Sequence, residues 1–144
     1  MNLYQKFIVN GAPRGKQRAR TFYNARMGKM QSITPEATKD YESLIRWSFT
    51  QAGCAYAGDK DIMLRIVAVY PIPKSFSKSK RQMAMDGWIL PRVKPDVDNV
   101  AKAVLDALNG VCYADDKQVV QLIVSKEYGA EPRLEVSMEV LAWE

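Results

Sequence analysis

The sequence predicts an α+β fold: a single domain over residues 1–144, with one mixed sheet of about four strands and two main helices packed against it. Segments with alternating apolar residues, typical of strands, are interspersed with segments of helical spacing. The chain has 144 residues, 47% of them hydrophobic, which is enough to bury one sizeable core without disulfide or metal staples. No repeat or long linker divides it.

The first strand is expected at residues 3–10, where an apolar run ends at a Gly-Ala-Pro turn. The first helix should begin with Thr34 as its N-cap and Pro35 at its first position, and should end at Gly53. A second strand is expected at residues 61–70. Both of its faces are apolar, which predicts a central position in the sheet.

A short helix is expected at residues 78–86, capped by Ser77. A longer helix follows, and beyond it apolar residues at 119–124 and an alternating pattern at 134–142 predict two more strands. The predicted order is therefore strand, helix, strand, short helix, helix, strand, strand. Helices packed against one sheet are the simplest arrangement in which these elements bury their apolar faces.

The longer helix lies in the stretch 94–118, KPDVDNVAKAVLDALNGVCYADDKQ, around which the candidate site is organised. Apolar residues from Val97 to Leu108 recur at the spacing of one buried helical stripe. Gly110 suits the left-handed position that follows a helix. The stretch therefore predicts a helix that ends at its Asn-Gly pair.

Three carboxylates and one lysine stand at the two ends of this helix. Asp96 precedes the first turn, Asp98 and Lys102 lie on a narrow arc beside the apolar stripe, and Asp116 follows the loop after the helix. Asp116 approaches the other carboxylates only if that loop and the next strand fold back. The three acids would suit Mg²⁺, with Mn²⁺ as an alternative ion, and Lys102 could approach the scissile phosphate. Taken singly, each acid is more readily explained as a helix cap.

The composition excludes several kinds of chemistry. The chain has no histidine, and Cys54 and Cys112 lack CxxC spacing, which removes histidine acid–base catalysis and zinc fingers. Any catalysis must rest on carboxylates, lysine or metal-activated water. No run of 18 apolar residues and no secretion signal is found, so we expect a soluble, cytoplasmic protein without a membrane partner.

The net charge of +5 is distributed unevenly. Residues 1–93 carry sixteen Lys or Arg and six Asp or Glu, whereas residues 94–144 carry five and ten. A basic body beside an acidic segment suits a metal-dependent enzyme that acts on a polyanion. By composition alone, a solvated surface with uneven charge is an equal alternative.

One basic segment near the N-terminus holds six cations and no acid: Arg14, Lys16, Arg18, Arg20, Arg26 and Lys29. Its glycines and proline favour a loop or hairpin that could follow a phosphate backbone, so these six residues are predicted to bind DNA. Phe22 and Tyr23 are interleaved among them and could stack on an unpaired base. The alternative is a mobile, solvated loop whose aromatic residues pack onto the core.

The residues of the candidate site resemble those of a known family. The matching positions are Asp96, Asp98, Asn99, Lys102, Asp106, Leu108, Asn109, Gly110, Asp115, Asp116 and Gln118. Together with the basic run VNGAPRGKQRAR, they resemble the signature of the RusA-like Holliday junction resolvases, small endodeoxyribonucleases of bacteria and their phages. The resemblance spans most of the chain, and its specific part is confined to residues 94–118.

The resemblance implies a homodimer that binds four-way DNA junctions and, with magnesium, nicks two opposing strands symmetrically in DNA recombination and repair. The family's catalytic set maps onto Asp96, Asp98, Asp116 and Lys102, and the three aspartates are the implied metal ligands. The basic run departs from the family's usual proline-rich version, so a preferred junction sequence is not carried over.

Two other functions stay open. In a DNA-binding protein without catalysis, the acids would be caps and the basic segment would hold the DNA. Three carboxylates beside a DNA surface repel phosphate, however, unless a metal neutralises them. A nuclease for flaps or other branched DNA would share the chemistry and differ only in its substrate.

Overall fold

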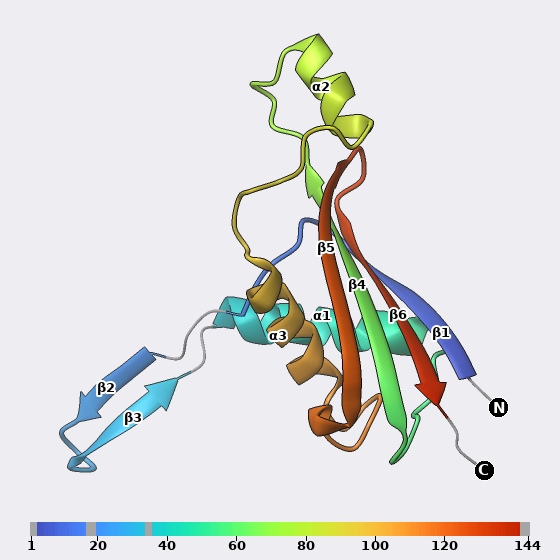
Figure 1. Cartoon of the computed structure of the whole chain (residues 1–144). Coiled ribbons are helices and arrows are strands. Elements are labelled where there is room, and N and C mark those ends of the chain that lie inside the picture. Colours follow the sequence, from blue (N-terminus) through green and yellow to red (C-terminus); the bar gives the residue numbers. More distant parts are fainter. Residues whose placement is uncertain (1–2, 17–19, 34–35, 142–144) are drawn as a thin grey trace.

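The computed structural model describes residues 3–16, 20–33 and 36–141, with only the main chain of Arg20 (Figure 1). Its elements, in chain order, are β1 (Leu3–Asn10), β2 (Arg20–Asn24), β3 (Lys29–Ile33), α1 (Glu36–Gln51), β4 (Asp61–Pro71), α2 (Lys78–Met85), α3 (Val97–Leu108), a 3₁₀ helix η1 (Asp116–Gln118), β5 (Val119–Gly129) and β6 (Arg133–Leu141). The predicted α+β class and single domain agree with this architecture.

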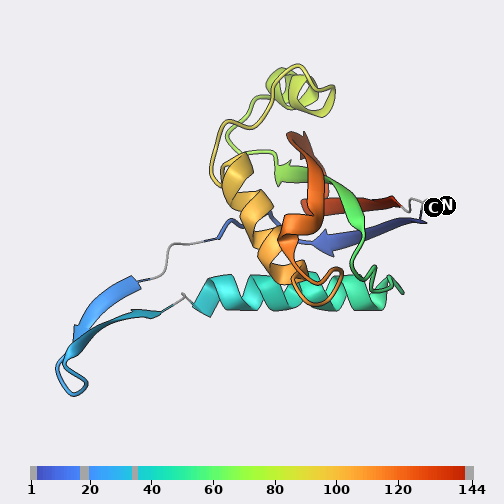
Figure 2. The same ribbon diagram turned by 60° about the horizontal axis from the view of Figure 1, so that its bottom comes forward.

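The main sheet has four strands in the order β1-β6-β4-β5. β6 is antiparallel to both of its neighbours, whereas β4 and β5 are parallel, so the sheet is mixed as predicted. α1 and α3 lie on the same side of it (Figure 2), and α2 stands beyond one end (Figure 1). The central position predicted for residues 61–70 is confirmed, since β4 lies between β6 and β5.

The core lies between the sheet and the two main helices. Alternate residues of β4 point into it, among them Ile62, Leu64 and Ile66, which are almost completely buried. α1 contributes Tyr41, Ile45 and Phe49, and α3 contributes Val100, Val104 and Leu108. The apolar stripe predicted for α3 is therefore the face that anchors this helix to the sheet, apart from Val97, which is 44% exposed.

Several predicted boundaries are confirmed. The hydroxyl of Ser77 caps α2 by accepting a hydrogen bond of 3.2 Å from the Lys80 N–H. Gly110 has a φ of +77° after α3, as its predicted role requires. The predicted caps Thr34 and Pro35 lie outside the described residues. No helix in the described ranges is long and apolar enough to cross a membrane.

The largest difference from the prediction is a second sheet, formed by β2 and β3. The sequence allowed a loop or a hairpin here, and the structure has an antiparallel hairpin that projects away from the body (Figures 1 and 2). The alternative in which its aromatic residues pack onto the core is wrong: Phe22 is 38% exposed and Tyr23 is 63% exposed.

Candidate active site

The helix that carries the predicted carboxylates begins at a point fixed to the sheet. Pro95, joined to Lys94 by a cis peptide bond, has a carbonyl oxygen that accepts a hydrogen bond of 2.6 Å from the hydroxyl of Tyr70 in β4. Burial, and next the negative charge of Asp96, raise the pKa of Tyr70 to about 12. The hydroxyl therefore remains a donor and holds the start of α3 in place.

Asp96 and Asp98 lie at this start, and both are exposed. Asp96 occupies the N-cap position, yet its side chain forms no capping hydrogen bond. Asp98 lies in the first turn, where a carboxylate stabilises the positive end of the helix dipole. No described residue forms a hydrogen bond or ion pair with either side chain. Capping thus leaves the Asp96 carboxylate unexplained.

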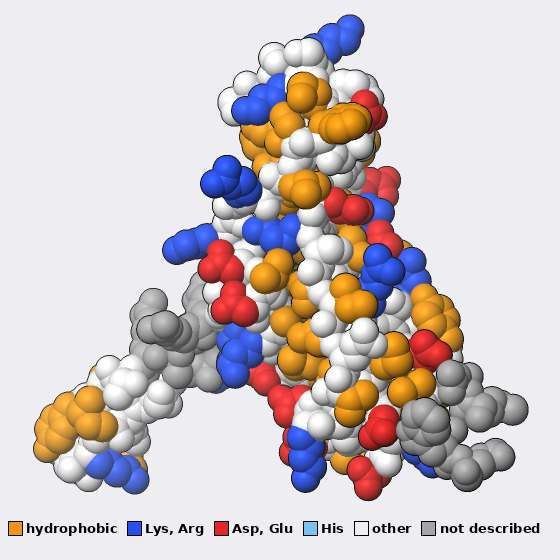
Figure 3. Space-filling view, in the orientation of Figure 1, with side chains coloured by type: hydrophobic (Ala, Val, Ile, Leu, Met, Phe, Trp, Pro, Cys, Tyr) orange, Lys and Arg blue, Asp and Glu red, His pale blue; other side chains and the backbone are white. Residues whose placement is uncertain are grey.

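Both carboxylates open onto a cleft of about 680 Å³. It is lined by Pro13, Arg14, Gly15, Lys16, Ala37, Thr38, Lys94, Pro95, Asp96, Asp98 and Asn99. Figure 3 shows acidic and basic side chains close together between α2 and the β2–β3 hairpin. A cleft with unpaired carboxylates and nearby cations can hold a metal ion and a phosphate together.

Lys16 fastens the basic segment across α3. Its N–H donates a hydrogen bond of 3.2 Å to the carbonyl of Asn99, and its ammonium group pairs with Asp106 and, at 3.6 Å, with Glu42. The hydrogen bond to Asp106 raises the pKa of Lys16. Lys16 was predicted to contact phosphate, but its charge is already neutralised by two carboxylates, so a phosphate would have to displace them.

Gly15 makes the close approach of this segment possible. A Cβ at this position would lie 2.8 Å from the Cβ atoms of both Pro95 and Asn99, closer than carbon atoms pack. Gly15 therefore permits the contact that places the neighbouring Arg14 at the cleft.

Asp116 is held by the loop that leads from α3 to β5. Asp115 caps η1 by accepting a hydrogen bond of 3.0 Å from the Lys117 N–H, and its own N–H donates to the Gln118 side chain at 2.9 Å. The hydrogen bond with Asp115, followed by burial, raises the pKa of Asp116. The charges next to Asp116 are those of Asp115, Asp106 and Lys102.

The structure thus brings Asp96 and Asp98 to one cleft, whereas Asp116 lies in η1, after α3. Within the described ranges, no group of three or more His, Cys, Asp or Glu side chains is arranged to hold one metal ion. The three-carboxylate ligand set stays a prediction. The pair Asp96 and Asp98 fits Mg²⁺, which commonly takes one or two carboxylates and completes its shell with substrate phosphate and water.

The other predicted DNA contacts are spread between the cleft and the hairpin. Arg14 is exposed at the cleft, and Arg26 and Lys29 are exposed on the hairpin. Arg18 and the side chain of Arg20 lie outside the described residues.

Sequence reasoning missed the structural roles of Gly15, Tyr70 and Gln118. A recognisable signal exists for Gln118, because Asp115 and a glutamine three residues later form the pattern of a capping box. Nothing local identifies Gly15 or Tyr70, whose partners are distant in the sequence.

Comparison with known proteins agrees with this site. The family model described as endodeoxyribonuclease RusA matches residues 10–139, which include the whole cleft and the Asp115–Asp116 pair. A protein of Bacillus subtilis (strain 168), described as the uncharacterized protein YqaN, is 38% identical over 133 residues, covering 91% of this chain and 92% of that protein. The chain therefore belongs to the RusA endodeoxyribonuclease family.

Proposed function

We propose that this protein is a magnesium-dependent endodeoxyribonuclease that resolves four-way DNA junctions by paired, symmetric nicks, in DNA recombination and repair. The observation that carries the proposal is the cleft at the start of α3. There, the carboxylates of Asp96 and Asp98, which form no hydrogen bond or ion pair with any described residue, line the same cleft as Arg14 and Lys94. Membership of an endodeoxyribonuclease family supports the reaction class.

Asp96 and Asp98 would hold the ion from the protein side, and Asp116 is the proposed third ligand. When bound, Mg²⁺ supplies Lewis-acid chemistry: it lowers the pKa of a water molecule and offsets charge on phosphate oxygens, which removes the need for a histidine base. Mn²⁺ accepts the same oxygen donors and would substitute for it.

Two cations of the chain would act on the phosphate itself. Arg14, exposed at the cleft, would bind a phosphate of the strand and orient it against the carboxylates. Lys102 lies one helical turn after Asp98 and near Asp116, and its ammonium group is exposed. From there it would stabilise the negative charge that develops on the leaving oxygen.

Paired nicks require two copies of the site, so we propose a twofold homodimer. Exposed apolar residues outside the cleft support a contact with a second copy: Trp88 is 79% exposed, and Tyr4, Ile8 and Ile123 are exposed on the side of the sheet opposite α1 and α3. Two further apolar residues, Ile89 and Leu141, are half-buried and offer less surface for such a contact.

A DNA-binding protein without catalysis is the second candidate. It is favoured by the separation of Asp116 from the other two acids, since no described group of three acids is arranged around one ion. The two candidates differ in what metal does: the nuclease needs it to cut, whereas the binder is indifferent to it.

The test is to incubate the protein with labelled four-way, flap, single-stranded and duplex DNA, in Mg²⁺, in Mn²⁺ and in chelator. We expect cutting of the junction in either ion and none in chelator. Asp96→Asn, Asp98→Asn and Asp116→Asn should each cut about 100-fold more slowly, a loss of about 3 kcal/mol of transition-state stabilisation. Their binding should be unchanged or tighter, because a negative charge facing phosphate is removed.

Glu131→Gln is the matched control, because it removes an exposed carboxylate from the turn between β5 and β6, which does not line the cleft. An aspartate variant that cuts at the wild-type rate leaves the proposed catalytic set. Preferential cutting of the flap would replace the junction as substrate, and tight binding with no cutting in either ion would establish the non-catalytic candidate.

A further inference from the structure

The β2–β3 hairpin, residues 20–33, is held together without support from the core. Its strands are paired from Arg20 opposite Ile33 to Asn24 opposite Lys29. Asn24 closes the turn: its side-chain oxygen accepts hydrogen bonds from the Arg26 and Met27 N–H groups at 3.0 and 3.3 Å. Its carbonyl oxygen accepts from the Gly28 N–H at 2.8 Å. An isolated two-stranded hairpin is marginally stable in water. Because this hairpin does not pack against the core, packing does not explain why it carries exposed apolar residues.

The hairpin presents an aromatic ring on each of its two faces. Phe22 and Tyr23 are neighbours in β2, so their side chains point to opposite faces. Tyr23 is paired with Met30, which is 60% exposed and extends the apolar surface of that face. Phe22 is paired with Gln31 on the other face. A ribbon with an exposed ring on both sides is suited to insertion between two flat partners.

We propose that this hairpin is a wedge that enters the branch point of DNA and stacks Phe22 and Tyr23 on the terminal bases of two diverging arms. The proposal rests on the proposed function for its DNA partner, but not on the metal or the cutting step. Base-to-aromatic stacking needs only the flat face of a base, so the wedge would recognise the branch and not its sequence.

The thickness of the ribbon confines it to branched DNA. Side chains on two faces give a β layer a thickness of about 10 Å, judged from the spacing of packed sheets. Neighbouring base pairs in a duplex are about 3.4 Å apart. The hairpin is therefore too thick to intercalate in an intact duplex, and fits only where helical arms part.

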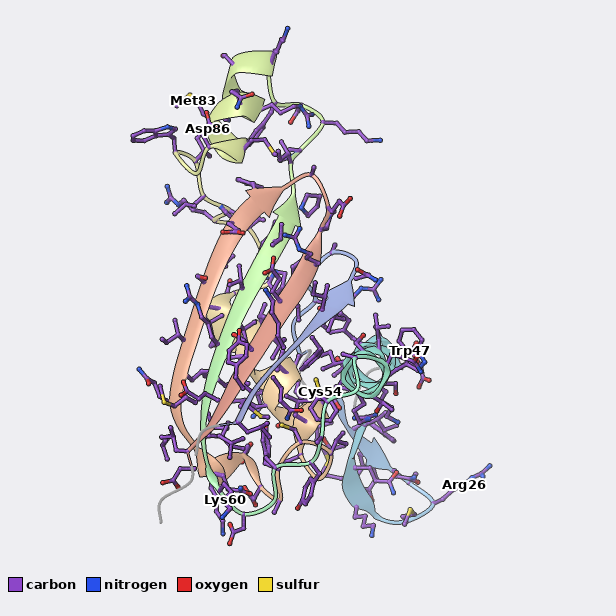
Figure 4. The ribbon with its side chains drawn as sticks, turned by 90° about the vertical axis from the view of Figure 1, so that its right-hand side faces the viewer. Arg26, Trp47, Cys54, Lys60, Met83 and Asp86 are labelled. Atoms are coloured by element: carbon purple, nitrogen blue, oxygen red, sulfur yellow. The ribbon has the colours of Figure 1, made fainter. Side chains whose placement is uncertain are left out.

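Charge favours DNA over a second copy of the chain as the occupant. The described part of the hairpin carries Arg26 and Lys29 and no acid, and the chain as a whole has a net charge of +5. Arg26 lies at the hairpin tip and points away from the body (Figure 4), where it would meet phosphates of the inserted arms. A second copy, itself basic, offers no general attraction to such a tip.

The hairpin also stands in the right place relative to the cleft. Residues 13–16 line the cleft, and β2 begins a few residues later in the chain. A strand of five residues is about 17 Å long, so the wedge and the carboxylates would act within one to two turns of the same DNA arm. The wedge would thereby fix the distance between the branch point and the phosphate in the cleft.

The experiment compares wild type with Phe22→Ala/Tyr23→Ala, measured in chelator so that cutting plays no part. Affinities for an immobile four-way junction and a linear duplex of the same length are determined by fluorescence anisotropy. A 2-aminopurine base placed at the branch reports stacking. We expect the double variant to lose about tenfold or more in junction affinity, to keep its duplex affinity, and to abolish the 2-aminopurine response.

Three further measurements make the result specific. Phe22→Trp/Tyr23→Trp should restore junction affinity, because tryptophan stacks as well. Tyr56→Ala, which removes an aromatic residue that is 56% exposed outside the hairpin, should change nothing. The dependence of log affinity on log salt should be unchanged in the double alanine variant and flatter in Arg26→Ala/Lys29→Ala, since only the latter removes phosphate contacts.

The wedge is overturned if the double alanine variant keeps the wild-type ratio of junction to duplex affinity, or if the double tryptophan variant fails to restore that ratio. It is also overturned if the double alanine variant changes the oligomeric state and leaves DNA binding intact. That last result would assign the hairpin to a protein contact. If the wild type cuts junctions and the double alanine variant keeps the wild-type ratio of junction to duplex affinity, only the wedge is rejected. If the wild type neither prefers nor cuts branched DNA, the proposed function is rejected as well.

Discussion

Replacing Gln118 with methionine should destabilise the protein and displace Asp116. Gln118 is 7% exposed, and its side chain joins two loops. Its amide nitrogen donates to the carbonyl oxygens of Gly58 and Lys60 at 2.7 and 2.9 Å, and its oxygen accepts from the Asp115 N–H at 2.9 Å. Methionine keeps the length of the side chain and removes all three hydrogen bonds.

The magnitude follows from the three bonds. Each neutral hydrogen bond contributes about 1 kcal/mol net, and the two carbonyl oxygens lie in loops that water can partly reach, so the free energy of unfolding should fall by about 2–4 kcal/mol. For a chain of 144 residues this corresponds to a drop in Tm of about 5–12 °C. Cutting should slow as well at temperatures far below Tm, because Asp115 and Asp116 are no longer held.

The free energy of unfolding is measured by urea denaturation followed by circular dichroism, with the slope against urea compared between variants. Gln51→Met is the matched control, because the same substitution is made on an exposed residue at the end of α1. A Gln118→Met protein within about 0.5 kcal/mol of wild type would refute the reasoning. If the Gln118→Met protein is less stable but cuts at the wild-type rate, Gln118 is not needed to position Asp116.

Three other outcomes are expected. Gly15→Ala should weaken junction binding and cutting and lower the free energy of unfolding by about 1–3 kcal/mol, because the added methyl group clashes with Pro95 and Asn99 and pushes Arg14 from the cleft; unchanged binding would contradict this. Burial alone would raise the pKa of Glu135, but Lys6 and Arg133 hold it below its usual 4.5. Its stabilisation is therefore present above that pH and lost as pH falls through the folded pKa, and Glu135→Gln should lose less stability on acidification in urea titrations. Mixing wild type with Asp96→Asn should convert a cruciform plasmid to open circles in place of linear product, whereas a monomer on the junction by sedimentation would exclude paired nicking.

The elements of this fold could be predicted because their patterns are local. The boundaries of α3 follow from apolar spacing and from Gly110, and α2 begins at Ser77 as its capping role requires. The same local geometry places Asp96, Asp98 and Lys102 at one end of one helix, since residues within two turns of a helix have a fixed relation. These three candidate residues needed no tertiary information.

The arrangement of the strands was not predictable in the same way. β1 and β6, the first and last strands, are neighbours, and β4 pairs with β6 on one side and β5 on the other. An alternating pattern states which face of a strand is buried, but not which strand lies beside it, because any neighbour with a matching apolar face satisfies the pattern.

The amino-acid sequence by itself determined the class of fold, the family, the acidic start of α3 and the excess of cations near the N-terminus. Only the tertiary structure decided what those groups contact. Lys16 meets Asp106 across 90 positions of sequence, Gly15 packs against Pro95 and Asn99, and the Gln118 side chain donates to the carbonyl oxygens of Gly58 and Lys60. Such contacts depend on how whole elements dock, and docking is set by the summed packing of the core and not by the residues that happen to meet.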